Sequence, residues 1–445
     1  MTATVPEQTI LSKPYLLATV GSWSLVFLAA FESLAITTVM PVIAADLDGR
    51  GLYSLAFSAT LAAGVVGTVA AGSWSDRRGP TVPLFASIGV FALGLAVAGT
   101  AQSMDVFVAG RFLQGLGAGG ETVALYVVIA KIYPARLHTR LFGAFAAAWV
   151  LPSLVGPFAA GVVADLLSWH WVFLGVVVLV VVATAMVAPA VRGLEHEPAP
   201  TRPGEVRRVA ASIAVAVAVV ALSYDWYVIV VAPVALVVIV AAVHPLVPAG
   251  TYRARRGLPA AILLCAAAGA VFFGTEVYLP LLLHDHYGLP AWLSGITLTA
   301  AALSWALASN LQGRYSEQLS EAAAMWIGSV LLAAGAVVEL ATAALTLPPV
   351  VAAVGWLAAG GGMGTLYPRV AALVLALSEP GEEGFNVSAK GIADSVGGSV
   401  ALALTGLLFG SGSFVAVFAF STLVGVTVVL IARRTGPARP ARSDP

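Results

Sequence analysis

The sequence has 445 residues, of which 60% are hydrophobic and only 10% are charged, and its formal net charge is zero. Because a soluble domain carries about a quarter charged residues, this much apolar surface cannot be buried in a water-soluble core and must face a lipid bilayer. The balanced charge gives no reason to expect a nucleic-acid partner, and the single cysteine, Cys265, excludes a disulfide framework and a thiolate metal cluster.

A helix that crosses a bilayer needs about 20 mostly apolar residues. In chain order, the predicted spans cover 16–40, 54–73, 82–101, 106–130, 141–164, 171–190, 208–223, 226–246, 258–283, 292–312, 323–345, 350–376, 388–410 and 414–432. The first run is too long for a cleaved signal peptide. The pair at 208–246 can also be one long run, but Asp225 near its middle fits a turn better than the bilayer centre. We therefore expect a hairpin, and fourteen spans in all.

Basic residues gather in alternate connections between the spans. With the N-terminus in the cytoplasm, the outer loops hold only Arg50, whereas the inner segments hold Lys13, Arg77, Arg78, Lys131, Arg136, Arg140, Arg192, Arg202, Arg207, Arg208, Arg253, Arg255, Arg256, Arg314, Lys390, Arg433, Arg434, Arg439 and Arg442. An excess of Lys and Arg marks cytoplasmic loops. The sequence therefore predicts a multi-pass protein of the cell membrane with both termini in the cytoplasm.

Two breaks divide the spans into sets. A linker rich in Pro, Arg and Glu at 191–207 follows the sixth span, and a basic segment, Arg253 to Arg256, follows the hairpin. We therefore expect an N-terminal six-helix bundle, a region of linkers and inserted hairpin, and a C-terminal six-helix bundle with a short tail, at 1–190, 191–257 and 258–445.

Short patterns recur in the two bundles. Gly72 and Asp76 end the second span of the first set, and Gly313 and Glu317 end the second span of the second set. In the fourth spans, Gly115, Gly117 and Gly119 are echoed by Gly360, Gly362 and Gly364. Two matches in register favour duplicated halves, an architecture common in secondary transporters.

The loop after the second span has the pattern G-x-x-x-D-R-x-G at Gly72, Asp76, Arg77 and Gly79. Glycine lets two membrane helices approach closely. An acid and a base at a helix end can make a contact that holds one conformation of a transporter. We therefore predict that Asp76 and Arg77 form a structural switch, with an ordinary positive-inside loop as the alternative.

The fourth span contains Arg111, Gln114 and Glu121. An arginine inside lipid costs several kcal/mol unless it is paired or hydrated, so Arg111 must face the interior of the bundle. Gln114 and Glu121 are seven residues apart and share one helix face, about 10 Å apart along the axis. We expect Arg111 to be turned to the side of that face.

The fifth span combines prolines and glycines at Gly143, Pro152, Gly156, Pro157 and Gly161. Prolines kink a membrane helix and leave carbonyl groups without their usual partners, and the glycines allow close packing against a neighbour. A generic kinked helix is the alternative interpretation.

These segments resemble three motifs of the major facilitator superfamily: its loop motif, its fourth-span R-x-x-Q-G-x-G motif and its fifth-span antiporter motif. The antiporter pattern G-x8-G-x3-G-P-x2-G-G is matched except at Pro152 and Ala160, where the family has glycine. Glu32, nine residues before Pro41, resembles the acid-to-proline spacing of the fourteen-span drug:proton antiporters. The resemblance implies an all-α major facilitator fold, with two six-helix bundles plus an inserted two-helix hairpin.

Five acids lie inside predicted spans, at Glu32, Glu121, Glu276, Glu339 and Asp394. Burial favours the neutral form of a carboxyl group and a nearby arginine favours the charged form, so a carboxyl under both influences can exchange protons. The resemblance places the first and fourth spans of each half at a central cavity. We therefore predict proton coupling at Glu32, Glu121 and Glu276.

The remaining predictions concern Asp394, Glu339 and the lining of the substrate cavity. Asp394 is predicted to be a buried charge, although it lies near a span end where water can solvate it. Glu339 lies in a span that is usually peripheral in the resembled fold. Apolar and aromatic side chains are expected to line the substrate cavity, and the candidates are Phe31, Trp149, Phe273 and Tyr278.

The sequence predicts a secondary transporter, a proton-coupled antiporter that exports small apolar or cationic compounds and uses no cofactor or metal. Its expected partners are protons, a small-molecule substrate and the lipid bilayer. One alternative is a major-facilitator transporter of a single defined solute such as a sugar, an organic acid or a siderophore. A non-transporting lipid-handling scaffold is another, and a membrane enzyme or channel is a third. Because few Asn, Gln and His lie in the spans, the sequence favours apolar, loosely recognised substrates.

Overall fold

The computed structural model describes residues 9–13, 15–191, 194, 204–223, 228–315, 318–379, 382–410 and 412–436. Regular secondary structure in these ranges is helical throughout. The first six helices are α1 (Leu16–Asp46), α2 (Tyr53–Arg78), α3 (Thr81–Gly99), α4 (Met104–Ile132), α5 (Ala135–Leu166) and α6 (His170–Val191). They follow the predicted spans to within six residues at each end, and the largest differences are at the end of α1 and the start of α5.

The remaining helices are α7 (Glu205–Leu222), α8 (Val228–Val243), α9 (Leu258–Glu276), α10 (Tyr278–Asp285), α11 (Ala291–Arg314), α12 (Glu321–Leu345), α13 (Pro349–Ala376), α14 (Glu383–Phe409) and α15 (Phe414–Ala432). Short 3-10 turns, η1 (Arg50–Leu52), η2 (His244–Leu246) and η3 (Thr251–Arg253), lie in three of the connections. The predicted break inside 208–246 is confirmed as two separate helices.

Twelve segments of the described chain are long and apolar enough to cross a membrane, with α9 and α10 joined into one bent segment. The hairpin helices fall short of this standard. Helix α7 starts with three charged side chains, Glu205, Arg207 and Arg208, and α8 has only 16 residues. The predicted fold of two six-helix bundles and an inserted hairpin is confirmed, while the crossing of the bilayer by the hairpin stays a prediction.

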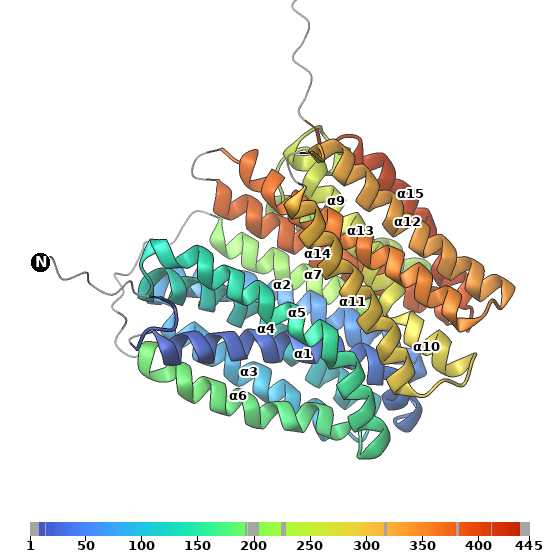
Figure 1. Cartoon of the computed structure of the whole chain (residues 1–445), viewed down its shortest axis with the longest axis horizontal. Helices are drawn as coiled ribbons and strands as arrows, with labels where there is room; N and C mark the ends of the chain where they lie inside the picture. The colour runs from blue at the N-terminus through green and yellow to red at the C-terminus, as the bar shows by residue number, and fades with distance from the viewer. Residues whose placement is uncertain are drawn as a thin grey trace, which may run out of the picture.

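The two bundles repeat one packing scheme (Figure 1). Helix α4 packs on α2 and α3, and α13 packs in the same way on α11 and α12. Helix α1 packs on α5 and α6, and α9 packs on α14 and α15. The helices of the first bundle, coloured blue to green, run along the lower part of Figure 1, and those of the second, coloured yellow to red, lie above them and to the right.

Glycines bring the fourth helix of each bundle against the second. A Cβ atom added at Gly115 would lie 2.0 Å from the carbonyl oxygen of Thr60, and one added at Gly360 would lie 2.3 Å from that of Ala301. One helical turn later, a Cβ atom added at Gly119 or at Gly364 would lie 2.2 Å from a backbone carbonyl oxygen of the second helix of its bundle. No side chain fits at these distances. The predicted glycine repeat therefore corresponds to the same close helix–helix contact in both bundles.

Substitution of Gly119 should therefore cost stability. In a Gly119→Ala variant the new methyl group meets a backbone carbonyl of α2, and overpacking of this kind costs about 1–3 kcal/mol. The matched control is Gly72→Ala in α2, where the nearest atom is Val123 Cγ1 at an ordinary 3.6 Å. Thermal unfolding of the purified protein checks the prediction, and equal melting temperatures for the two variants would contradict it.

The two bundles meet most closely at the end of the molecule that holds η1, which we call the Arg50 end. Arg50 Nη1 lies 2.9 Å from Asp285 Oδ2, and the Tyr53 hydroxyl donates to the Val277 carbonyl at 2.9 Å. Ser54 of α2 packs directly on Gly406 of α14. The opposite end carries most of the described basic side chains, among them Arg77, Arg78, Lys131, Arg314 and Arg433, and we call it the basic end.

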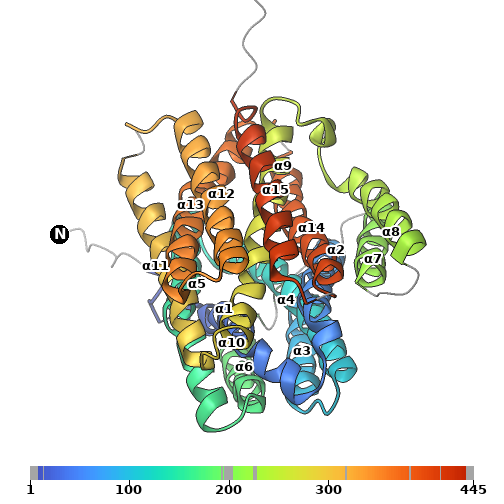
Figure 2. The same cartoon turned by 90° about the vertical axis from the view of Figure 1, so that its right-hand side faces the viewer.

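The hairpin of α7 and α8 stands at the side of the two bundles, with α7 against α2 and α14 (Figure 2). Arg77 of α2 makes an ion pair with Glu205 at the start of α7 at 2.9 Å. Arg208, one turn later, lies 5.2 Å from the centre of the Phe385 ring on α14. Helix α7 is therefore attached to both bundles at the basic end.

Candidate functional site

Helix α4 places Arg111 in the interior of the first bundle. The Ser103 hydroxyl caps the helix start by accepting from the Val106 amide, and the helix begins at Met104, seven residues before Arg111. The side chain of Arg111 is only 3% exposed. Glu32, from the middle of α1, has a side chain that is 5% exposed. A charge in such a place is stable only when it is paired and hydrogen-bonded.

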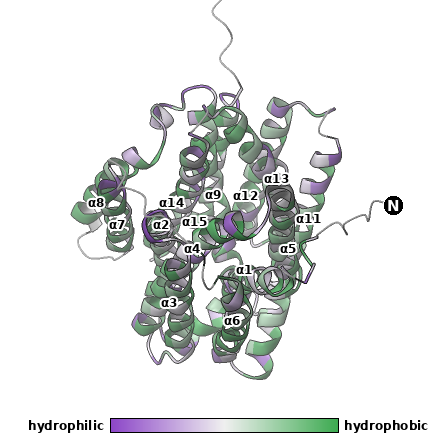
Figure 3. Ribbon diagram, turned by 90° about the vertical axis from the view of Figure 1, so that its left-hand side faces the viewer, coloured by the Kyte–Doolittle hydropathy of each residue, from purple (hydrophilic) through white to green (hydrophobic). Residues whose placement is uncertain are grey.

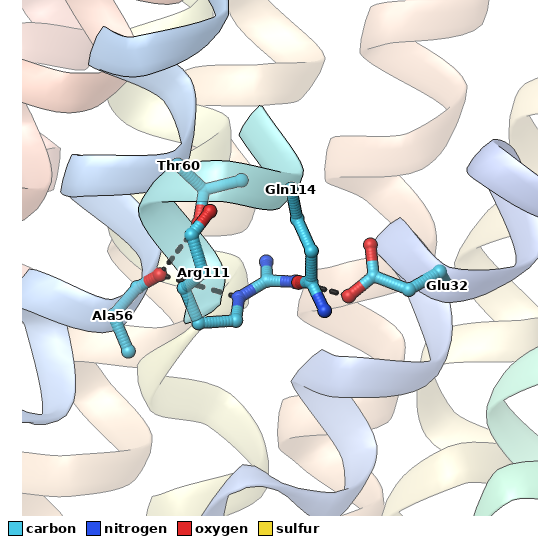
Figure 4. Close-up of polar contacts among 5 residues, drawn as sticks. All are labelled: Glu32, Ala56, Thr60, Arg111 and Gln114. Carbon is cyan, nitrogen blue, oxygen red and sulfur yellow. Dashed lines mark hydrogen bonds and ion pairs between the residues drawn. The ribbon is translucent and has the colours of Figure 1, made fainter. Parts of the chain in front are cut away.

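Arg111 makes an ion pair and several hydrogen bonds (Figure 4). Its Nη1 donates to Glu32 Oε1 and to Gln114 Oε1. Its Nε donates to the carbonyl oxygen of Ala56 in α2 at 3.4 Å. Thr60 supports the same place, because its hydroxyl donates to the carbonyl of Ala56 at 2.8 Å and to that of Arg111 at 3.1 Å. Side chains from α1 and α4, together with the Ala56 carbonyl and the Thr60 hydroxyl of α2, therefore form one buried polar site.

The geometry differs from the sequence expectation in one respect. We expected Arg111 to be turned to the side of the helix face that Gln114 and Glu121 share. In the structure, Arg111 and Gln114, three residues apart, lie on neighbouring positions of the helix surface, and the long guanidinium side chain extends to Glu32. Glu32 is thus half of a buried ion pair.

The site has a spare donor. Within the described residues, Gln114 Nε2 is buried without a hydrogen-bond partner. If a proton neutralises Glu32, the guanidinium loses its counter-charge and keeps only the neutral acceptors of Gln114 and Ala56. Electrostatic interactions are strong in a site with little water, so one proton changes the balance of contacts between α1 and α4. Protonation of Glu32 would therefore remove a charged contact between α1 and α4.

Glu121 and Glu276 are not part of this ion pair. Glu121 comes ten residues after Arg111 on α4, about 15 Å along the helix axis, and is 2% exposed. In the described structure its Oε2 is buried without a hydrogen-bond partner. Glu276 is partly exposed at the end of α9. Pro280 has no N–H to bond the Glu276 carbonyl, which explains why the helix breaks there.

A second polar cluster lies in the C-terminal bundle. The Tyr367 hydroxyl of α13 donates to Asp394 Oδ1 of α14. The Lys390 ammonium group lies 4.9 Å from the centre of the Tyr367 ring. Asp394 is thus held by a hydrogen bond. Sequence reasoning did not select Tyr367 or Lys390. Lys390 and Asp394 are four residues apart and therefore lie on one helix face. This spacing is the feature of the sequence that could have indicated the cluster.

The other charged residues considered in the sequence analysis lie outside these two clusters. Arg369 Nε donates to Gln312 Oε1 of α11 at 2.7 Å. Glu339 of α12 is fully buried, and both its carboxyl oxygens lack a hydrogen-bond partner in the part of the chain that is described. Arg77 of the predicted switch contacts Glu205 of the hairpin.

The predicted cavity residues lie in different surroundings. Trp149 of α5 is 50% exposed. The Phe31 ring is 3.4 Å from the Cβ position of Gly156, and the Phe273 ring lies against Gly398 of α14. Tyr278 is fully buried and packs on Tyr53 and Phe409, with ring centres 5.8 and 5.1 Å away. Tyr278 therefore lies in the contact between the two bundles at the Arg50 end.

The fifth-span glycines and prolines contribute to the contact between bundles. A Cβ atom at Gly161 would lie 2.8 Å from the Trp292 Cα of α11, and one at Gly295 would lie 2.6 Å from the Pro157 carbonyl. Pro152 is buried. Gly143 lies in α5, but its surroundings are outside the described residues. This segment therefore packs α5 on α11 close to the Arg50 end.

Comparisons with known proteins agree with this architecture. The profile of the Major Facilitator Superfamily matches residues 22–368. An uncharacterized transporter of Schizosaccharomyces pombe is 36% identical over 148 residues, which are 33% of this chain and 25% of the relative. An MFS efflux transporter of Aspergillus oryzae is 35% identical over 148 residues, 33% of this chain and 27% of the relative. The match thus spans about a quarter of the length of these relatives.

Solved structures show the same fold. The chain is similar to a POT family transporter in complex with 5-aminolevulinic acid, with a TM-score of 0.69 and 14% identity over 94% of this chain and 93% of the other. It is also similar to peptide transporter POT in complex with sulfate, with a TM-score of 0.66 and 15% identity over 94% and 95% of the two chains.

Proposed function

Since the chain belongs to the major facilitator superfamily and is a multi-span membrane transporter, we propose that it is a proton-coupled antiporter of the cell membrane. It exports small apolar or cationic compounds by alternating access, with its basic end and both termini in the cytoplasm. The observation that carries the proposal is the Arg111 side chain, which is buried and shared between Glu32 and Gln114.

Proton coupling follows from the chemistry of this site. With Glu32 ionised, the ion pair holds α1 against α4. With Glu32 protonated, Arg111 keeps its charge but loses its counter-ion, so the bundle is stabilised in an arrangement that hydrates or re-pairs the guanidinium. A ligand or proton shifts a conformational equilibrium only by its differential affinity for the two states. The Glu32–Arg111 pair provides such a difference.

Alternating access requires that the contacts at the Arg50 end open and close. The ion pair of Arg50 with Asp285, the Tyr53 hydrogen bond and the packing of α5 on α11 hold this end together. These contacts support a state that is closed at the Arg50 end, from which the substrate space opens toward the basic end. In this proposal the carboxyl groups of Glu121 and of Glu276, which lies where α9 ends, also carry protons.

The substrate class follows from the side chains near the bundle interface. Phe31, Trp149 and Phe273 offer apolar and aromatic surface, which suits apolar compounds and, through the aromatic faces, cations. The similarity to an efflux transporter of Aspergillus oryzae supports export as the direction.

Transport in proteoliposomes tests the proposal. The probes are radiolabelled tetraphenylphosphonium, a lipophilic cation, and a panel of apolar dyes, each measured with and without an imposed pH gradient. We expect gradient-driven transport by the wild type. In a Glu32→Gln variant, the rate of transport driven by the pH gradient should fall by about 5- to 150-fold. This is the range that coupling free energies of about 1–3 kcal/mol produce.

The matched control is Glu339→Gln, which makes the same change at another buried acid outside the proposed path. It should retain gradient-driven transport. Full proton-driven transport by Glu32→Gln would contradict the coupling role of Glu32. A wild type that moves only one solute class would contradict export of unrelated compounds.

A further inference from the structure

The inserted hairpin carries an open groove along its length. Between α7 and α8 there is a groove of about 840 Å³ near the basic end, and a second hollow of about 530 Å³ continues it along the same helices. The two share Ala210, Ala214 and Val238. Because alanine side chains are small, they leave space between the helices that larger residues would fill.

The walls of the groove are apolar over most of their length. On α7 they are formed by one stripe of residues three or four positions apart, Ala210, Ala214 and Val217, and on α8 by Val234 and Val238. Val217 is 64% exposed and Val234 is 57% exposed. Figure 3 shows both helices coloured mostly as hydrophobic, at the side of the two bundles. With the hairpin in the bilayer, as the sequence predicts, this surface would face the acyl chains of lipid.

The mouth of the groove at the basic end is polar and positively charged. Arg207 and His244 line it, together with Tyr252, whose hydroxyl donates to the Val240 carbonyl at 2.6 Å. Among the described residues, none that lines either part of the groove is acidic. Arg207 begins the same helix stripe that continues as Ala210 and Ala214.

The other charged side chains at the start of α7 are directed away from the groove. Glu205 pairs with Arg77 of α2, and Arg208 lies over the Phe385 ring of α14. Successive residues of a helix point about 100° apart, so anchoring Arg208 on the bundle turns Arg207 toward the groove. Among the described residues that line the groove, the exposed Arg207 thus places a guanidinium at the polar end of an apolar surface.

The dimensions match one leaflet of a bilayer. From Arg207 to Val217 is ten residues, about 15 Å along α7, which is half of the roughly 30 Å hydrocarbon core. Basic pockets between membrane helices on the cytoplasmic side bind anionic lipid head groups. We propose that the α7–α8 groove binds an anionic phospholipid of the leaflet at the basic end. Its phosphate contacts Arg207 and His244, and an acyl chain lies along Ala214 and Val217.

Lipid retention by the purified full-length protein tests this assignment. Wild-type protein, washed in detergent and supplied with equal amounts of phosphatidylglycerol and phosphatidylcholine, should retain phosphatidylglycerol preferentially by native mass spectrometry. Arg207→Gln should lower that preference about fivefold, since one basic residue near the surface contributes about 1 kcal/mol to anionic lipid binding. Addition of inorganic phosphate should not displace the lipid.

The matched control is Arg314→Gln, which removes an exposed positive charge at the end of α11, away from the hairpin, and should keep the preference. Ala214→Trp, which fills the groove, should reduce retention of both lipids. Thermal unfolding identifies any variant that fails to fold. Equal retention of the two lipids by wild-type protein, or an unchanged preference in Arg207→Gln, would overturn the proposal.

Discussion

An Arg111→Met variant is expected to lose transport, and its free energy of unfolding should fall by about 3–5 kcal/mol. Removal of the guanidinium leaves the Glu32 carboxyl buried without its partner. Methionine keeps a long, flexible side chain, so the change tests the charge and hydrogen bonds more than the volume. Thermal unfolding of the purified protein measures the stability, and gradient-driven flux in proteoliposomes measures the transport.

The double variant Glu32→Gln with Arg111→Met separates the two effects. With both charges removed, no unpaired ion is buried, and replacement of a whole buried pair by neutral groups is often neutral or stabilising. We expect most of the stability to return while proton-driven transport stays absent. Arg314→Met, at an exposed position, is the control for loss of a positive charge. Equal stability of Arg111→Met and wild type would show that the pair does not hold α1 on α4.

Cross-linking α2 to α14 is expected to stop transport completely. Ser54 Cβ lies 2.8 Å from the Cβ position of Gly406, and disulfides form at Cβ separations of about 3.5–4.5 Å. A separation of the helices by about 1 Å therefore lets a Ser54→Cys, Gly406→Cys pair close a disulfide. Because this contact lies at the Arg50 end, the bond should lock that end shut and abolish flux.

Reduction provides the internal control for the locked variant. Flux should return when a reductant opens the disulfide, and each single cysteine variant should be unaffected by oxidant. The native Cys265 is fully buried, so it interferes little with the introduced pair. Equal flux from the oxidised and reduced double variant would show that the α2–α14 contact does not open during transport.

The helices were well predicted from the sequence because each depends on local composition. Long apolar runs, prolines and charged ends are read directly along the chain, and the observed helices follow them. The break between α7 and α8 was also predictable from Asp225. The division of the ninth predicted span into α9 and α10 was not predicted, although Pro280 gives it a local physical reason.

The candidate site was predicted as residues but not as contacts. Glu32, Arg111 and Gln114 were each selected, since a charged or amide side chain inside a membrane span needs a partner. Their joint hydrogen bonding was not predicted, because 79 positions separate Glu32 from Arg111 and no local pattern reports which helices become neighbours. The Tyr367–Asp394 contact was missed for the same reason.

The sequence by itself determined that this chain crosses a membrane, where most helices begin and end, and that its halves repeat, because hydropathy and glycine spacing are properties of the chain itself. Only the tertiary structure decided which charges compensate each other. It pairs Glu32 with Arg111, leaves Glu121 without a partner for its Oε2 among the described residues and anchors Arg77 on the hairpin. Pairing in a bundle depends on helix order and rotation, which are set by packing between distant segments.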